Sequence, residues 1–291
     1  MKHIQTIWVL GGDVRQAYLA RLLCQDGYHV HTFALEQSAV SCPELIPEID
    51  LSHLEDAQVV ILPLPVSTKD GNLFAPLSTQ VASLDEIISL VHGKQLLLGG
   101  RPNPKVIAAA RQHGLTMLDY FSREELAVAN CVPTAEGCLQ LAMEHMPITI
   151  HGSRALILGY GRLGRITAAR FAALGSHVTV AARKQEQFAW AEAAGHQTLP
   201  IHSLSGSLGE FDLVVNTIPF PVLGEALLQE LPSGCLVIDL ASDPGGVDYA
   251  AAQTLNCRVL HALALPGKCA PASAAAIVQQ TLYHIFHERG H

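Results

Sequence analysis

The sequence predicts an α/β fold of two domains, each built on an open parallel sheet. Short apolar runs typical of buried strands alternate with Ala- and Leu-rich stretches typical of helices, which is the pattern of helices packed on both faces of a parallel sheet. The length of 291 residues is enough for two cores. Ligands of such folds bind where domains meet, so we expect an interdomain cleft.

Charge and cysteine content exclude several classes of function. The net charge of −8 and the pI of about 6.0 offer no basic surface for nucleic acid. The seven cysteines are never spaced C-x-x-C, and His29 and His31 lack a third ligand, so neither a disulfide framework nor a metal site is expected. No secretion signal or membrane-length apolar run is recognised, which favours a cytoplasmic protein without a membrane partner.

Residues 1–128 are expected to form an N-terminal substrate domain of about five βα units, braced by a C-terminal helix within 271–291. Its first strand ends at Gly11-Gly12-Asp13, where Asp13 is suited to cap the next helix. Arg15 is either solvated on the first turn of that helix or holds a substrate carboxylate at the carboxyl edge of the sheet. Asp13 and Gln16 flank it and are grouped with it as substrate-binding candidates.

Residues 129–270 are expected to form the second domain, which opens with a strand, a glycine-rich turn and a helix. The spacing Gly159-x-Gly161-x-x-Gly164 provides a tight turn, a bare backbone and close packing of helix on strand. The pyrophosphate of a dinucleotide would bind the helix N-terminus there. This predicts a Rossmann-like or flavodoxin-like NAD(P) domain in which the turn contacts the cofactor through Gly159, Tyr160, Gly161, Arg162, Leu163 and Gly164.

The end of the second strand of this domain bears on the choice of nucleotide. NAD sites usually place Asp or Glu there to bind the ribose hydroxyls, but this strand ends in Ala182-Arg183-Lys184. Two cations without a carboxylate suit a 2′-phosphate. NADP is therefore favoured over NAD.

Three later turns should lie at the same sheet edge. Asp239 and Asp243 are either turn caps or functional, and Ser242 between them is a substrate-binding candidate. Lys268 follows Pro266-Gly267 in an apolar region and is a candidate clamp for a carboxylate. The other cofactor-binding candidates in these turns are Asn216, Thr217, Ile218, Pro219, Leu240 and Ala241.

The hinge between the domains and the linker after it supply the remaining candidates. Pro133 is expected to end one helix and Thr134 to cap the next. Thr134 and Glu136 either face substrate or are a cap and a solvated carboxylate. Glu136, His151 and Lys268 form the catalytic candidate set, while His261 is a further acid or base candidate unless it is structural.

Several of these stretches together resemble the family of dipicolinate synthase A subunits over essentially the whole chain. The resemblance is carried by Gly11-Gly12-Asp13-x-Arg15-Gln16, Val132 to Gly137, Thr149 to Ser153, Asn216 to Pro219, Asp239 to Gly246, and Leu265 to Pro271. One departure is Asp243, which stands where a basic residue is expected before Pro-Gly-Gly.

The resemblance implies a sporulation enzyme of the mother-cell cytoplasm. With a flavoprotein-like B subunit of the same synthase, it would oxidise dihydrodipicolinate from the lysine pathway to dipicolinate, by NAD(P)-dependent chemistry on a ring CH–CH or CH–NH group. In that reaction Arg15 and Lys268 would hold the carboxylates, and Glu136 or His151 would accept a proton. A homo-oligomer is also expected. The alternatives are a non-catalytic NADP-binding subunit whose partner does the chemistry, and a D-2-hydroxyacid-type dehydrogenase.

Overall fold

The computed structural model describes residues 4–290, which form two compact units. The first unit combines the chain up to Ala129 with the chain from Ala270 onward, and the second comprises Asn130–Cys269. None of the helices in the described part is both long enough and apolar enough to cross a membrane.

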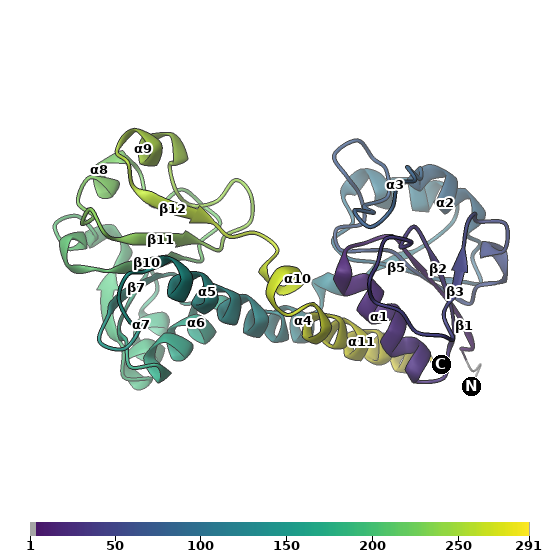
Figure 1. The fold of residues 1–291 in the computed structure, drawn as a ribbon, viewed down its shortest axis with the longest axis horizontal. Helices are drawn as coiled ribbons and strands as arrows, with labels where there is room; N and C mark the ends of the chain where they lie inside the picture. Colours follow the sequence, from purple (N-terminus) through teal and green to yellow (C-terminus); the bar gives the residue numbers. More distant parts are fainter. Residues whose placement is uncertain (1–3, 291) are drawn as a thin grey trace. The chain divides into compact units, whose positions relative to one another are not determined.

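The first unit is a six-stranded parallel sheet with helices on both faces (Figure 1). The strands lie in the order β3-β2-β1-β4-β5-β6. The strands are β1 (Thr6–Leu10), β2 (His29–Phe33), β3 (Ile46–Glu48), β4 (Val59–Ile61), β5 (Leu96–Gly99) and β6 (Met117–Asp119). The helices are α1 (Val14–Gln25), α2 (Leu84–Leu90), α3 (Pro104–Gln112), α4 (Glu124–Ala129) and α11 (Pro271–Glu288).

The second unit is also a six-stranded parallel sheet, with the order β12-β11-β10-β7-β8-β9. Its strands are β7 (Arg154–Leu158), β8 (His177–Ala182), β9 (Gln197–Pro200), β10 (Leu213–Asn216), β11 (Leu236–Asp239) and β12 (Arg258–His261). Its helices are α5 (Cys131–His145), α6 (Arg162–Ala173), α7 (Gln185–Ala193), α8 (Glu225–Leu228), α9 (Tyr249–Thr254) and α10 (Leu265–Cys269).

The strand order decides between the two expected versions of the α/β fold. Numbered within its own unit, each sheet reads 3-2-1-4-5-6, the order of dinucleotide-binding sheets rather than of flavodoxin. The order changes direction between β1 and β4 in the first unit and between β7 and β10 in the second. Ligands of open sheets bind outside the carboxyl ends of the strands at such points.

Two edge strands were missing from the elements expected from the sequence. They are β3 and β9, which have three and four residues, and every residue in them is exposed or only half-buried. Each also contains a proline, a residue that sheets tolerate at their edges. Short, half-exposed strands lack the apolar run that marks a buried strand, and so the first unit has six strands rather than about five.

Apolar side chains fill both faces of each sheet. In β1, Ile7 and Val9 pack beneath α1 and α11, whereas Trp8 and Leu10 face the side covered by α2 and α3. The alternation follows from the two-residue period of a strand. Helices α5 and α6 cover one face of the second sheet, and α8 and α9 cover the other. Helix α11 packs along α1 (Figure 1), so the last helix belongs to the core of the first unit.

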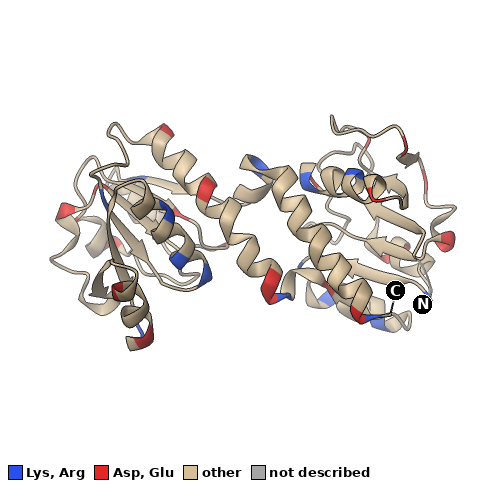
Figure 2. Cartoon of the chain, turned by 90° about the horizontal axis from the view of Figure 1, so that it is seen from below, with Lys and Arg blue, Asp and Glu red and all other residues tan. Residues whose placement is uncertain are grey.

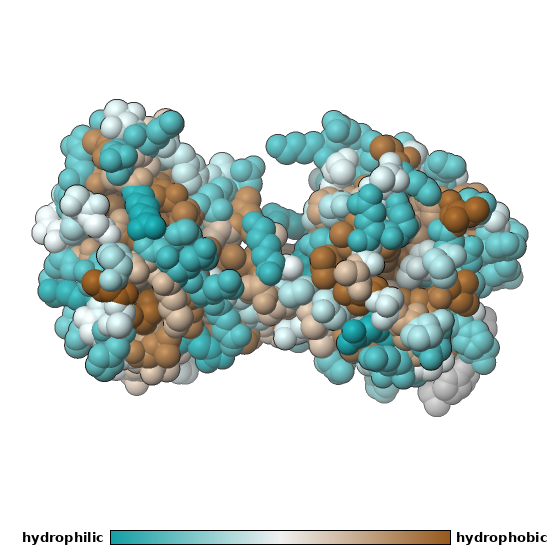
Figure 3. Space-filling view, viewed as in Figure 1, coloured by the Kyte–Doolittle hydropathy of each residue, from teal (hydrophilic) through white to brown (hydrophobic). Residues whose placement is uncertain are grey.

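The surfaces of both units carry charges of both signs. Figure 2 shows Lys and Arg residues spread over the two units together with Asp and Glu. Hydrophobic residues appear among hydrophilic ones on the face drawn in Figure 3.

Candidate functional site

The three glycines of the turn after β7 are under three different constraints. Gly159 has φ = +92°, and a Cβ there would lie 2.6 Å from Oγ1 of Thr217. A Cβ on Gly164 would lie 2.1 Å from the carbonyl oxygen of Gly159, so α6 starts in contact with the turn. A Cβ on Gly161 would meet no atom within 4 Å. The open side of Gly161 is where a turn of this type admits a pyrophosphate.

The start of α6 adds hydrogen-bond donors at the same place. Its N-cap is Gly161, which has no side chain to accept from the backbone N–H groups of the first turn. The first N–H groups of a helix have no partner within the helix and carry the positive end of its dipole. An anion is therefore stabilised at this helix end.

Two exposed cations follow β8. Arg183 and Lys184 lie between the last residue of the strand and the first residue of α7. Their backbone N–H groups donate to Oε1 of Gln187, at 3.4 and 3.2 Å, so the side chain of Gln187 caps this helix start. No carboxylate stands at the end of the strand, and both cationic side chains reach solvent.

A fully buried carboxylate ties together the turns that follow β10 and β11. Oδ1 of Asp239 accepts from Nδ2 of Asn216 at 2.8 Å and from the N–H of Ala241 at 3.0 Å. Oδ2 accepts from the N–H of Gly246 and the hydroxyl of Tyr249, both at 2.7 Å. Asp239 therefore acts as a turn cap that shapes the loop around Ser242. Its carboxylate is not a free functional group.

Gly245 and Gly246 allow the loop to close on this carboxylate. A Cβ on Gly245 would lie 2.6 Å from Oδ2 of Asp239, and one on Gly246 would lie 2.3 Å from Nδ2 of Asn216. Burial, and then the hydrogen bond to Asp239, raise the pKa of Tyr249 above its usual range. Tyr249 therefore stays protonated and keeps donating.

The turn residues proposed for the cofactor are held by hydrogen bonds between side chains and backbone. Oγ1 of Thr217 donates to the carbonyl of Leu158 at 2.9 Å, and the N–H of Ile218 donates to Oδ1 of Asn216 at 3.1 Å. Pro219 is exposed, whereas Leu240 and Ala241 are buried. The turn after β10 lies next to the glycine turn because β10 pairs with β7, and the turn after β11 lies one strand further away.

His261 ends β12 at the same edge of the second sheet. Its Nε2 lies 3.2 Å from the carbonyl oxygen of Ala241, and its ring packs 5.1 Å from the ring of Tyr249. A carbonyl accepts only, so Nε2 carries a proton here. Tyr249 was not among the expected site residues, because its link to Asp239 appears only when the loop is folded.

In the first unit, Arg15 lies at the point where the strand order changes direction. Asp13 caps α1 by accepting from the N–H of Arg15, and its carboxylate also binds the guanidinium at Nε and Nη2. Nη2 donates in addition to the carbonyl of Leu64 beyond β4, at 2.9 Å. The side chain of Arg15 is only 14% exposed, so the solvated alternative is wrong.

The other groups around Arg15 are buried. Gln16 donates from Nε2 to the carbonyl of Ile61 at 3.3 Å. The hydroxyl of Tyr120 donates to the carbonyl of Leu62 at 3.2 Å, and burial raises the pKa of Tyr120 above its usual range. A small hollow between Gly12, Arg15 and Tyr120 has about 10 Å³, roughly the space of one water.

Arg101 is a cation at this edge that the sequence patterns did not indicate as a site residue. It follows Gly99-Gly100 at the end of β5, has φ = +57°, and is exposed. Its N–H donates to Oδ1 of Asp119 at 3.0 Å. Such a backbone conformation is uncommon for arginine and clusters at ligand sites. The glycine pair before it at the end of a strand was the available indication.

Comparison with known proteins identifies the family of the chain. The A subunit of dipicolinate synthase from Bacillus subtilis (strain 168) is 31% identical over 291 residues, a match that covers 97% of this chain and 96% of that protein. The chain belongs to the family of dipicolinate synthase A subunits. The model of this family's N-terminal domain matches residues 6–121. The NAD binding domain of D-isomer specific 2-hydroxyacid dehydrogenases matches residues 117–265, so the second unit is an NAD-binding dehydrogenase domain.

Solved structures agree with the family. The A subunit of dipicolinate synthase from Bacillus halodurans matches with a TM-score of 0.90 and 29% identity, over 97% of both chains. The transhydrogenase from Sinorhizobium meliloti matches with a TM-score of 0.72 and 14% identity, over 98% of this chain and 94% of that one. The second similarity shows a shared dehydrogenase fold only.

In this member of the dipicolinate synthase family, two hinge candidates lie inside a helix. Pro133 and Thr134 belong to the first turn of α5, which already begins at Cys131, so the expected cap at Thr134 is wrong. The hydroxyl of Thr134 donates to the carbonyl of Asn130. Glu136 is exposed, and its Oε1 lies 3.9 Å from Nε of Arg170. Arg170 is eight residues beyond Arg162, the first residue of α6. That separation is about 12 Å of helix, so Glu136 is far from the glycine turn.

The remaining candidates differ in their relation to the sheet edge. His151 precedes β7, and a Cβ on Gly175 after α6 would lie 2.2 Å from its Nδ1. His151 is therefore at the amino edge of the sheet, opposite the glycine turn. Ser242 and Lys268 are both exposed, in the loop after β11 and in α10. Within residues 4–290, Lys268 makes no ion pair.

Proposed function

We propose that this chain is the nicotinamide-dependent subunit of a dipicolinate synthase, which oxidises dihydrodipicolinate to dipicolinate at a ring CH–CH or CH–NH group. The observation that carries the proposal is the open side of Gly161 in the NAD-binding domain of a member of this family. A nicotinamide dinucleotide supplies the hydride acceptor when it is bound. The relatives are named as the A subunit of their synthase, which supports a second subunit. The proposal takes this to be the flavoprotein-like B subunit that the sequence resemblance implies. The same proposal includes a homo-oligomer in the mother-cell cytoplasm.

The residues of the second unit have distinct proposed roles in binding the nucleotide. The N–H groups at the start of α6 bind the pyrophosphate beside Gly161. Arg183 and Lys184 bind a 2′-phosphate, which favours NADP over NAD. The turns that start at Asn216 and Leu240 border the nucleotide through their backbone.

Cations at the sheet edges are proposed to hold the substrate carboxylates. In the first unit, Asp13 and Leu64 orient the guanidinium of Arg15. Its Nη1 has no hydrogen-bond partner within residues 4–290 and offers N–H donors to a carboxylate. In the second unit, exposed Lys268 is the corresponding point charge, with Ser242 as a hydroxyl partner. Gln16 and Thr134 use their polar groups within the fold, so their contribution is to support the neighbouring backbone.

His261 replaces Glu136 and His151 as the proposed proton acceptor. Because Nε2 donates to the carbonyl of Ala241, the neutral ring keeps a lone pair on Nδ1. His261 also ends a strand at the carboxyl edge, as Glu136 and His151 do not. Loss of a ring proton to this nitrogen, together with loss of hydride, completes aromatisation.

The double variant Arg183→Ala/Lys184→Ala is expected to bind NADP(H) about tenfold to a hundredfold more weakly, because charge-assisted hydrogen bonds of about 1.5–3 kcal/mol are lost. Its affinity for NAD(H) should change less than about threefold, or 0.7 kcal/mol. Fluorescence titration with each nucleotide measures both values. The matched control is Lys94→Ala/Arg111→Ala, which removes the same charges from exposed positions of the first unit. Equal losses for both nucleotides would contradict the assignment of the 2′-phosphate.

The proposed activity is tested with freshly generated dihydrodipicolinate and NADP or NAD. Formation of reduced nucleotide and of dipicolinate is followed with this chain alone, with the partner alone, and with both. We expect product only when this chain is present. Full activity of the partner alone would instead assign the chemistry to the partner and leave this chain a nucleotide-binding role. Oxidation of 2-hydroxyacids in place of dihydrodipicolinate would favour the hydroxyacid dehydrogenase alternative.

A further inference from the structure

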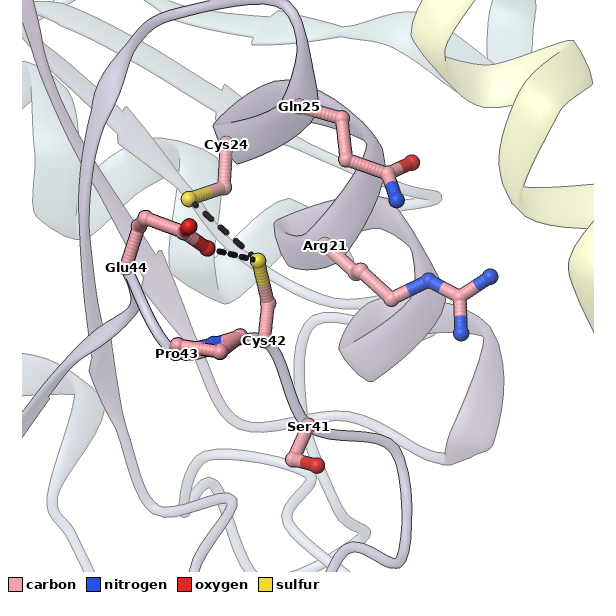
Figure 4. A pocket seen from close by; sticks show the side chains of 7 residues that line it. All are labelled: Arg21, Cys24, Gln25, Ser41, Cys42, Pro43 and Glu44. Atoms are coloured by element: carbon pink, nitrogen blue, oxygen red, sulfur yellow. Dashed lines mark hydrogen bonds between the residues drawn. The ribbon is translucent and has the colours of Figure 1, made fainter.

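Two cysteines and a carboxylate converge in the first unit, on residues that the proposed reaction does not use. Cys24 is in the last turn of α1 and is 9% exposed, while Cys42 and Glu44 are in the segment that connects β2 to β3. The sulfur of Cys42 lies 3.8 Å from that of Cys24 and 2.8 Å from Oε2 of Glu44. Figure 4 shows the sulfur of Cys42 joined to both of these groups. The three donor atoms all lie within 4.8 Å of one another.

These separations suit a tetrahedral ion bound by thiolates. Zn–S bonds of about 2.3 Å at a tetrahedral centre hold two sulfurs about 3.8 Å apart. The sulfurs of Cys24 and Cys42 already have this separation. The contact of Glu44 with Cys42 is a hydrogen bond, which opens by less than about 1 Å when the thiol proton is replaced by a metal at Zn–O of about 2.0–2.2 Å. Thiolate ligands select zinc over magnesium or calcium.

The surroundings leave room for a fourth ligand. A surface hollow of about 590 Å³ opens beside the three groups, and its other walls come from Arg21, Gln25, Ser41 and Pro43. The guanidinium of Arg21 points away from the two sulfurs (Figure 4). Water can therefore reach the open side of the cluster and complete a four-coordinate site.

The charge of the cluster also suits a cation. Without a cation, negative charges on these three groups would repel one another. A bound divalent ion offsets this repulsion because it stabilises thiolates directly.

We propose that Cys24, Cys42 and Glu44 form a binding site for one zinc-like divalent cation, with water as the fourth ligand. On binding, each thiol releases its proton to solvent and its sulfur bonds to the metal. The ion then fastens the segment between β2 and β3 to α1, where the two sulfurs are already in contact. A disulfide is the rival outcome, but it would need the sulfurs at about 2.05 Å and would leave Glu44 without its thiol donor.

The test uses the full chain, reduced and stripped of metal, and without a tag that would bind zinc on its own. The fifteen histidines of the chain would also bind zinc, so the readout must report thiolate ligands. Cd²⁺ alone is added under anaerobic conditions while thiolate-to-cadmium charge-transfer absorption is recorded, and Zn²⁺ is then added as competitor. The variants are Cys24→Ser, Cys42→Ser and Glu44→Gln. Cys257→Ser is the matched control, since it removes a half-buried thiol of the second unit. Circular dichroism checks the fold of each variant.

We expect one equivalent of cadmium with thiolate absorption that zinc removes, both in the unaltered chain and in Cys257→Ser. Cys24→Ser and Cys42→Ser should lose this absorption, and the well-exposed Glu44→Gln should weaken binding at least tenfold while the fold is kept. Absorption that persists in both cysteine variants would overturn the proposal. So would a reduced chain that binds no cadmium, or one whose Cys24 and Cys42 only cross-link on mild oxidation. None of these readouts depends on the proposed enzymatic activity.

Discussion

Replacing Gly161 with alanine is expected to leave the second unit folded and to weaken nucleotide binding, whereas the same replacement at Gly164 also destabilises the unit. At Gly161 the added methyl group meets no atom within 4 Å, and φ is −81°, which alanine adopts readily. The free energy of unfolding should therefore change by no more than about 0.5 kcal/mol. The methyl group occupies the side from which pyrophosphate approaches, so the affinity for NADP(H) should fall at least about tenfold, or 1.4 kcal/mol.

At Gly164 the methyl group would lie 2.1 Å from the carbonyl oxygen of Gly159, which is backbone and cannot rotate away. Helix α6 must shift, and we expect a loss of about 1–3 kcal/mol of stability or more, as for an overpacked core. Denaturant unfolding and nucleotide titration on both variants separate the two effects, and each variant is the control of the other. Unaltered nucleotide binding by Gly161→Ala would show that the pyrophosphate binds elsewhere.

Asp239→Asn is expected to be the most destabilising change among the turns at the carboxyl edge of the second sheet. The carboxylate accepts four hydrogen bonds and is fully buried. An amide in its place turns its N–H₂ group toward donors in either orientation. These are Nδ2 of Asn216 and the N–H of Ala241 at the Oδ1 position, or the N–H of Gly246 and the hydroxyl of Tyr249 at the Oδ2 position. Because buried donors without acceptors cost about 1–3 kcal/mol each, we expect a loss of about 3 kcal/mol.

The measurement is the denaturant midpoint, together with hydrogen exchange of the loop between Leu240 and Asp248. The matched control is Asp243→Asn, four residues away and exposed, which should change stability by less than about 0.5 kcal/mol. The loop should exchange faster in Asp239→Asn than in the control. Equal midpoints for the two variants would mean that Asp239 does not organise the loop.

The fold was largely predictable because its strands are continuous apolar runs that end in glycine or polar turns. The strand before Gly159 and the helix after it required only local spacing. The edge strands β3 and β9 were missed because half-exposed strands of three and four residues lack that pattern. Finding them is what assigned the dinucleotide-binding strand order to both sheets.

The candidate site was predictable only in part. Since His151 comes before β7 and Gly159 after it, the order along the chain already places them at opposite edges of the sheet. His151 could therefore have been separated from the cofactor turn without the structure. The position of Glu136 beside Arg170 depends on how α5 packs on α6, and no local pattern reports it.

By itself, the sequence determined the α/β class, the glycine turn and the cations after β8, because each depends on residues within about one strand, turn and helix of one another. Tertiary structure alone decided which residues meet across the chain. The Asp239 carboxylate needs Asn216 and Tyr249, and Arg15 needs Leu64. Cys24 and Cys42 are 18 residues apart, a spacing without meaning until α1 packs beside the segment before β3. Contacts of this kind follow from packing, which local spacing does not encode.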